Sequence, residues 1–180
     1  MIRRRDAMAD QRTRMSTTPA LPVLDADNAR FIGGGVSIIV SSRNAANAPE
    51  LVRAHGCRVS RDRRRVCLFL QAGQAGLLLA DIRKNGRIAV VFTRPTTHRS
   101  LQLKGDDAAL ARLRPHDAAR VAGYRDAMVA ELEGNGISEA LTRALLAGGG
   151  DGLVAIEFTP VAAFVQTPGP DAGKPLGSTP

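Results

Sequence analysis

Short apolar segments separated by polar turns fill the middle of the chain, and this pattern constrains the fold more than any other feature. Val36–Ser42 is rich in β-branched residues, and Arg87–Thr93 is a second apolar segment of strand length. Leu51–Ser60 and Arg65–Leu70 flank the polar residues 61–64, which predicts a β-hairpin. Because helical segments do not follow each strand in turn, the pattern disfavours a regular parallel α/β fold.

Three segments with helical spacing interrupt or follow these strands. The first, Gly73–Lys84, ends at Asn85-Gly86, a pair that favours a left-handed C-terminal cap. The second begins near Pro115, and Ser138 can cap a short third helix. The last two strands are predicted at Leu153–Phe158 and Ala162–Gln166. The order of elements therefore predicts an α+β, mainly β fold, with an antiparallel sheet or small barrel and peripheral helices.

Positive charge is concentrated in two short parts of the chain. The sequence has 25 Lys and Arg against 17 Asp and Glu, a net charge of +8. Residues 1–18 account for +3 and residues 57–67 for +4, so the rest of the chain is close to neutral. A nucleic-acid-binding surface needs its positive charge gathered on one face. The distribution therefore argues against nucleic acid as a partner and indicates a basic tail and one basic turn.

The two ends of the chain differ in composition from its middle, where we expect one domain over residues 21–167. Residues 1–20 lack periodicity and apolar content and are expected to form a disordered basic tail. Residues 168–180 form a Pro/Gly-rich C-terminal extension, which is expected to run over a surface because proline cannot join a β-ladder. The longest uncharged stretch, Val66–Ala80, is too short and polar to span a bilayer, and the N-terminus lacks the apolar region of a secretory signal. A cytoplasmic protein without a membrane partner is therefore expected.

The two cysteines, Cys57 and Cys67, lie symmetrically about Asp62, so a hairpin that turns there would place them opposite each other. In a cytosolic protein they are expected to be reduced thiols in the core. With His55 they give three soft ligands, but there is no CxxC pair and no clear fourth ligand. Structural zinc requires four ligands at characteristic spacings, so no metal site is predicted.

Polar and apolar residues alternate cleanly over Arg99–Lys104. Leu101 and Leu103 fall on one face, which is expected to pack in the core, while the other face offers hydrogen-bonding groups. With the preceding turn, this segment supplies cationic donors, hydroxyls and an amide, a set suited to a phosphate or the edge of a polar heterocycle. A half-exposed strand without any ligand would show the same alternation. No catalytic triad, phosphate-binding loop or dinucleotide-binding motif is present.

A resemblance to a known family rests on three strings: VSRD at 59–62, RIAVVFTRPTTHRSLQLKG at 87–105 and AAFVQTPGP at 162–170. Together with the order of elements, they resemble the pyridoxamine 5'-phosphate oxidase-like family of FMN-binding split β-barrels. The resemblance extends from about Asp25 to Gly173. It implies a six-stranded antiparallel split β-barrel, usually a homodimer, with FMN in a groove at the subunit interface.

The same resemblance implies which residues would contact the flavin. These lie on the hairpin, at the start of the helix that follows it and along the later polar strand: Arg58, Ser60, Arg61, Gln74, Thr97, His98, Arg99, Ser100, Gln102 and Lys104. Arginine forks and hydroxyls suit a dianionic phosphate, and amides suit the edge of the isoalloxazine ring. This chain has QAGQAG at residues 71–76 where the oxidases of the family carry a basic pair.

The resemblance predicts an FMN-dependent oxidoreductase that acts on an unidentified small molecule. No residue is singled out as a catalytic acid or base, because in flavin chemistry the protein mainly positions the ring and excludes water. The sequence lacks Trp and the aromatic and Arg residues that close the substrate site of the oxidases, which argues against pyridoxamine phosphate as the substrate. The missing basic pair leaves an alternative: a split-barrel module without enzymatic activity that binds another ligand, haem or a deazaflavin.

Overall fold

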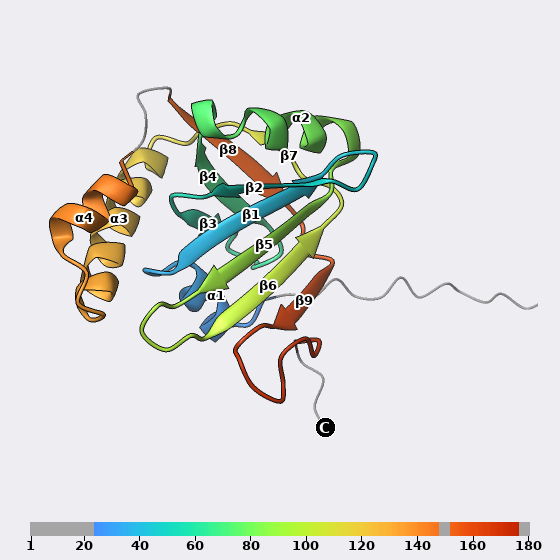
Figure 1. The fold of residues 1–180 in the computed structure, drawn as a ribbon. Coiled ribbons are helices and arrows are strands. Elements are labelled where there is room, and N and C mark those ends of the chain that lie inside the picture. The colour runs from blue at the N-terminus through green and yellow to red at the C-terminus, as the bar shows by residue number, and fades with distance from the viewer. Residues whose placement is uncertain (1–23, 148–151, 177–180) are drawn as a thin grey trace, which may run out of the picture.

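Two antiparallel β-sheets form the centre of the molecule (Figure 1). A computed structural model of the chain describes residues 24–147 and 152–176. Within them, the five-stranded sheet has the order β2-β1-β5-β6-β9 and the four-stranded sheet the order β3-β4-β8-β7. The strands are β1 (Ser37–Arg43), β2 (Pro49–Arg53), β3 (Cys57–Val59), β4 (Val66–Gln71), β5 (Ile88–Thr93), β6 (Ser100–Gly105), β7 (Ala109–Ala111), β8 (Leu153–Phe158) and β9 (Ala162–Val165).

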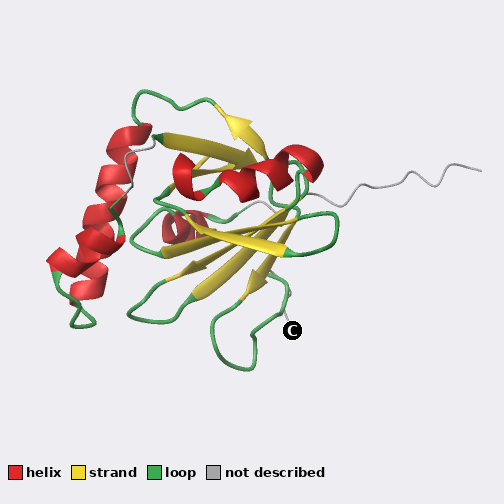
Figure 2. Cartoon of the chain, turned by 45° about the horizontal axis from the view of Figure 1, so that its top comes forward, coloured by secondary structure: helices red, strands yellow, loops and turns green. Residues whose placement is uncertain are grey.

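Helices lie at the periphery of the two sheets (Figure 2). They are α1 (Ala26–Ile32), the 3₁₀ turn η1 (Ala72–Gln74), α2 (Gly76–Asn85), α3 (Asp117–Glu133) and α4 (Glu139–Leu145). Helix α2 ends at Gly86, whose φ of 66° requires the left-handed conformation that glycine adopts without strain. None of the helices in the described part of the chain is long and apolar enough to cross a membrane.

The expected antiparallel sheet with peripheral helices is confirmed, whereas the six strands expected for the split β-barrel are not, because the described residues form sheets of five and four strands. The segment predicted as one strand, Leu51–Ser60, differs from the prediction because it is two strands in different sheets. Strand β2 pairs with β1, the chain bends at residues 54–56, and β3 then pairs with β4. Gly56 has a φ of 121° there, which a residue with a side chain rarely adopts. The predicted hairpin is therefore confirmed only for β3 and β4.

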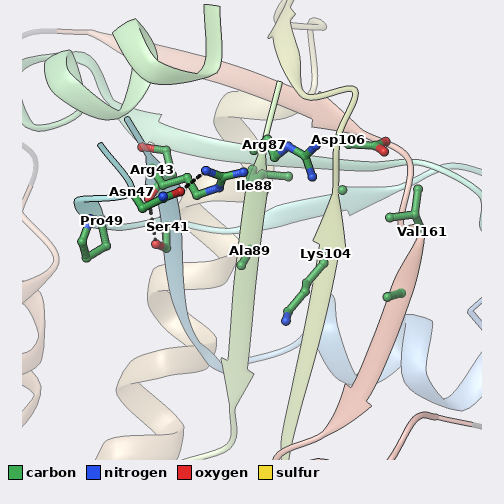
Figure 3. A pocket seen from close by; sticks show the side chains of 13 residues that line it. Ser41, Arg43, Asn47, Pro49, Arg87, Ile88, Ala89, Lys104, Asp106 and Val161 are labelled. Atoms are coloured by element: carbon green, nitrogen blue, oxygen red, sulfur yellow. Dashed lines mark hydrogen bonds between the residues drawn. The ribbon is translucent and has the colours of Figure 1, made fainter. Parts of the chain in front are cut away.

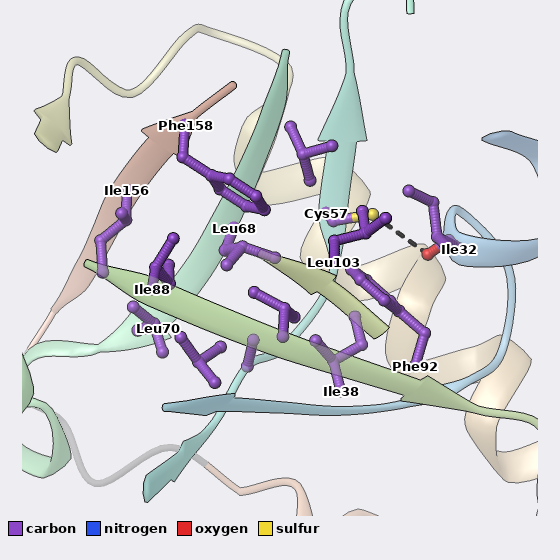
Figure 4. Packing of buried hydrophobic residues seen from close by; sticks show 14 of the residues in the cluster. Ile32, Ile38, Cys57, Leu68, Leu70, Ile88, Phe92, Leu103, Ile156 and Phe158 are labelled. Atoms are coloured by element: carbon purple, nitrogen blue, oxygen red, sulfur yellow. Dashed lines mark hydrogen bonds between the residues drawn. The ribbon is translucent and has the colours of Figure 1, made fainter. Parts of the chain in front are cut away.

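The core lies between the two sheets and is built from alternate residues of their strands (Figure 4). Leu101 and Leu103 of β6 are buried there, as their alternation predicts. Phe92 and Phe158, from opposite sheets, are fully buried in the same cluster. Side chains that point to the other side of the four-stranded sheet form a second cluster with Val121 of α3. The second face of the five-stranded sheet has no such cover in the part of the chain that the structure describes.

The C-terminal segment joins the edge of the five-stranded sheet, contrary to the expectation that its prolines exclude it from a ladder. Pro175 lies opposite Phe164 in an antiparallel bridge. The backbone of its neighbours makes the hydrogen bonds: Val165 donates to Lys174 (3.0 Å), and Leu176 donates to Ala163 (2.8 Å). An edge strand tolerates proline when the missing N–H would point away from the sheet.

The two cysteines point to opposite sides of the β3–β4 hairpin. Cys57 pairs with Leu68 and Cys67 with Arg58, so the register is one residue away from the arrangement that would place the thiols opposite each other. Both are free, buried thiols, as predicted. Burial raises the pKa of Cys57 to about 12 and that of Cys67 to about 11. The described residues contain no group of three side chains suited to hold a metal ion.

His55 lies in the connection between β2 and β3 and is 2% exposed. Neither nitrogen of its ring has a hydrogen-bond partner in the described part of the chain. Burial lowers the pKa of the imidazole, and the positive charges of Arg125 and Arg53 lower it further. His55 is therefore neutral in the folded protein near pH 7.

We expect His55 to make the folded protein sensitive to acid. Because its pKa is lowered by folding, its stabilising effect is complete above the ordinary histidine pKa of about 6.5 and is lost as pH falls toward the folded-state value. Thermal unfolding at pH 7.5 and pH 5.0 should show a smaller loss of Tm for His55→Leu than for the wild type. His116→Gln, at an exposed position, is the control and should keep the wild-type loss. Equal losses in His55→Leu and the wild type would contradict this role.

Candidate functional site

The ten predicted flavin-contacting residues occupy four separate places in the structure. Arg58, Ser60 and Arg61 lie on the β3–β4 hairpin, and Gln74 is the last residue of η1. The β5–β6 turn and the start of β6 carry Thr97, His98, Arg99 and Ser100. Gln102 and Lys104 lie further along β6. The six residues of β4 separate the hairpin turn from η1, a distance of about 20 Å at 3.3 Å per residue. One chain therefore does not bring all ten residues into a single site.

Arg58 forms a buried ion pair with Asp117, the first residue of α3. One of its guanidinium nitrogens lies 2.9 Å from each carboxylate oxygen, and the side chains are 9% and 1% exposed. Asp117 also accepts a hydrogen bond of 2.8 Å from the backbone of Arg114. The guanidinium lies 6.0 Å from the centre of the Phe69 ring. Because Arg58 already has a carboxylate partner, it attaches α3 to the four-stranded sheet instead of presenting its charge to solvent.

The turn of the β3–β4 hairpin is held by its own polar groups. Ser60 accepts a hydrogen bond from the backbone of Arg65 (2.9 Å) and donates one to Asp62. Arg63 adopts a φ of 58°, and its Nε donates to the carbonyl of Leu24 at 2.7 Å. Arg61 is exposed, and no described residue pairs with its guanidinium. Of the residues predicted on this hairpin, Arg61 is the one with a charge that is open to a ligand.

Arg99 attaches the β5–β6 turn to helix α1. Its guanidinium donates to Asp27 at 2.6 Å and to Asn28 at 2.9 Å, and it stacks over Phe31 at 4.3 Å. The hydrogen bond and the positive charge of Arg99 lower the pKa of Asp27. Helix α1 was not predicted, because it has only seven residues and its one clear signal is the N-cap Asp25.

The other residues of this turn differ in accessibility. Thr97 and His98 are exposed, and His98 has a φ of 57°. Ser100 is buried, and its hydroxyl lies 2.9 Å from that of Thr93 and donates to the carbonyl of His98 at 3.0 Å. The Ser100 hydroxyl is therefore already satisfied within the chain, while Thr97 and His98 remain accessible.

The outer side of the five-stranded sheet, which we call the open face, has no helix across it in the part of the chain that the structure describes (Figure 1). Gln102 lies at its centre, between Val91 of β5 and Phe164 of β9. No described residue forms a hydrogen bond with the Gln102 side chain, which is half-buried. The surrounding half-buried or exposed side chains are mainly apolar: Ile39, Leu51, Ala89, Val91, Ala162 and Phe164. Such a face is suited to a flat apolar ligand or a second copy of the chain.

A cavity of about 450 Å³ lies at one end of the open face (Figure 3). The end of β1, the beginning of β5 and the end of β6 bring three cations to it: Arg43, Arg87 and Lys104. Lys104 also lies 5.0 Å from the ring of Phe164. In the described residues, none of the three cations forms a salt bridge.

Sequence reasoning identified Lys104 but missed Arg43 and Arg87. Both are single arginines at strand ends, where charged residues are common and carry no motif. The strand order brings them together, because β1 and β6 are both neighbours of β5. The register aligns Ser41 with Ala89 and Ala89 with Lys104. A correct pairing of these three strands was the only signal that would have revealed the cavity.

Comparisons with known proteins identify the fold. No protein-family model and no curated protein matches the sequence. Among solved structures, HupZ of Group A Streptococcus is 16% identical with a TM-score of 0.51, over 84% of this chain and 100% of that one. A Clostridium acetobutylicum protein of the pyridoxinephosphate oxidase family is 12% identical with a TM-score of 0.43, over 72% of this chain and 78% of that one.

An F420 reductase is a further similar structure, at 14% identity and a TM-score of 0.44, over 74% of this chain and 93% of that one. Identities this low show likeness of fold alone. The likeness of fold is shown for HupZ, whose TM-score exceeds 0.5, and the family of the Clostridium protein agrees with the predicted resemblance to pyridoxamine 5'-phosphate oxidase-like split-barrel proteins.

Proposed function

We propose that the protein is an FMN-binding flavoprotein, an oxidoreductase for a small molecule, and that it binds the flavin against the open face as a homodimer. The observation that carries this proposal is Gln102. Its amide lies without a side-chain hydrogen bond at the centre of an apolar face that no described helix covers. If a ligand or subunit covers this face, removing the amide from water without a hydrogen-bond partner costs free energy. The covering group must therefore supply hydrogen bonds to Gln102.

The chemistry of this face fits the isoalloxazine ring. The ring is flat and largely apolar and has polar atoms at its edge. Val91 and Phe164 flank Gln102 on the neighbouring strands and offer apolar contact, while the amide can both donate and accept. Arg58 fits less well as a phosphate ligand, because Asp117 already neutralises its charge. Ser60, Arg61, Gln74, Thr97 and His98 remain predicted contacts of the cofactor.

When bound, FMN would supply hydride or single-electron transfer at N5 of its ring. The residues of the open face have simpler tasks. Gln102 would hydrogen-bond polar atoms of the ring, and the apolar residues around it would exclude water from one side. A second copy of the chain would cover the other side of the ring. No side chain of this face is required as an acid or base.

Titration with FMN, followed by absorption and by quenching of flavin fluorescence, tests the proposal. We expect saturable binding, and Gln102→Leu should weaken it about fivefold, the effect of one hydrogen bond of about 1 kcal/mol. Glu139→Leu is the control, since it removes an exposed polar side chain on α4, in a different part of the fold from the open face. A protein that remains colourless and binds no FMN would refute the proposal. Tighter binding of haem or of a deazaflavin than of FMN would favour the alternative.

A further inference from the structure

We propose that the cavity beside the open face binds the phosphate group of a small molecule. Three cations line it, Arg43, Arg87 and Lys104, against one carboxylate, Asp106. The lining therefore has a net charge of +2, which matches a phosphate monoester dianion. Arginine forks and a lysine ammonium are the side chains that proteins most often use to bind phosphate.

The backbone of the two arginines is held in place by one side chain. Asn85, the last residue of α2, donates from its amide nitrogen to the carbonyl of Arg43 at 2.8 Å. The amide oxygen of Asn85 accepts from the backbone nitrogen of Arg87, also at 2.8 Å. One side chain thus fixes the backbone of both arginines. Preorganisation of this kind reduces the conformational entropy that the site loses when a ligand binds.

The loop between β1 and β2 also helps to position Arg43. Asn44 accepts hydrogen bonds through its side chain from the backbone of Ala46 (2.9 Å) and Ala48 (3.0 Å). This turn places Asn47, with a φ of 61°, where its side-chain oxygen contacts the Arg43 guanidinium. Figure 3 shows Arg43, Asn47 and Arg87 gathered at one end of the cavity, with Lys104 on the neighbouring strand. All three cations line the same cavity, Arg43 at the end of β1, Arg87 directly before β5 and Lys104 on β6.

The absence of local neutralisation supports a ligand over a structural role. Elsewhere in the described residues, several arginines near a carboxylate are paired with it, including Arg58, Arg99 and Arg143. Asp106 lines the cavity but forms no salt bridge with any of the three cations. Gathered like charges repel, and an anion among them removes that repulsion.

The cavity is larger than phosphate alone requires. Its volume of about 450 Å³ lies within the range of small-molecule sites, and Pro49, Val161 and Ala162 add apolar surface. The ligand is therefore a molecule that joins a phosphate to a less polar body. The phosphate of FMN and the phosphate of a substrate share this chemistry. The assignment of the phosphate to FMN or to a substrate rests on the proposed function. The proposal that the cavity binds a phosphate group does not rest on it.

The first experiment measures phosphate binding without flavin. Pyrophosphate titrated into the full-length protein at low salt, followed by ³¹P NMR and calorimetry, should show saturable binding. Arg87→Gln and Lys104→Gln should each weaken it at least about tenfold, because charge-assisted contacts are lost. Arg83→Gln is the control: Arg83 is exposed on α2 and does not line the cavity, so affinity should not change. Circular dichroism of each variant verifies folding.

The second experiment identifies the molecule that carries the phosphate. FMN and riboflavin, which lacks the phosphate, are titrated into the wild type and Arg87→Gln. If Arg87→Gln weakens FMN but not riboflavin, the cavity holds the cofactor's phosphate. If FMN affinity is unchanged while pyrophosphate affinity falls, the cavity holds a substrate's phosphate. The proposal is overturned if the wild type does not bind pyrophosphate and the variants of Arg87 and Lys104 bind FMN as tightly as the wild type does. Failure of both flavins to bind, with pyrophosphate binding intact, would refute only the flavin proposal.

Discussion

The substitution Asp117→Leu is expected to lower the free energy of unfolding by about 3–5 kcal/mol, the typical loss when one partner of a buried ion pair is removed. Arg58 would then be a buried cation without a counter-charge, since Asp117 is its only acidic partner among the described residues. A single domain commonly has a total stability of about 5–15 kcal/mol, so this one change would remove much of it. Urea denaturation followed by circular dichroism measures the loss.

An exposed ion pair provides the comparison. Asp126 pairs with Arg143 at 3.0 Å, and both side chains are about half exposed or more (65% and 49%). Asp126→Leu should therefore cost less than about 1 kcal/mol. The double variant Arg58→Met/Asp117→Leu should recover part of the stability lost in Asp117→Leu, because it leaves no buried charge. If the double variant were less stable than Asp117→Leu, the desolvated charge of Arg58 would not be the cause of the loss.

The substitution Val91→Asp is expected to separate the proposed homodimer into monomers and to abolish FMN binding. Val91 lies on β5 at the centre of the open face, beside Gln102 and Ile39. In a symmetric dimer the new carboxylate would be buried on both copies, which is costly without a partner. In the monomer it faces water, so the fold should persist. We expect the dimer dissociation constant to rise at least about tenfold in sedimentation experiments.

Leu141→Asp is the matched control for this prediction. Leu141 is a large apolar residue with 52% exposure on α4, in a different part of the fold from the open face. The same change of charge there should leave both the oligomeric state and FMN affinity as in the wild type. A wild-type protein that is monomeric at high concentration would contradict the homodimer. A Val91→Asp variant that remains dimeric would show that the contact lies on another surface.

The elements that the sequence predicted well are those whose side chains follow one simple rule. From Leu101 to Gly105 the residues of β6 alternate between buried and more exposed positions, and Leu101 and Leu103 are buried as that alternation requires. The β3–β4 hairpin and helix α2 were predicted from a polar turn and from Asn85-Gly86, which are local signals. Local chemistry decides such elements, so one sequence is enough to identify them.

The elements that the sequence did not reveal depend on contacts between distant segments. The division of Leu51–Ser60 between two sheets follows from the pairing of β2 with β1, which no local pattern encodes. The family resemblance implied that Arg58 and Arg99 contact the flavin, and arginine is chemically suited to bind phosphate. Their carboxylate partners, Asp117 and Asp27, lie 59 and 72 residues away in the sequence. Only the folded structure shows that these charges are already neutralised.

The position of Asn85 has a mechanical consequence. Its side chain holds the backbone of Arg43 and Arg87, and it is also the last residue of α2. A ligand that tightens the two arginines would also suppress fraying of the last turn of this helix. Amide hydrogen exchange in that turn would then slow when the cavity is filled, although no ligand atom touches it. Helix α2 would act as a reporter of occupancy, which makes binding measurable even for a ligand without colour.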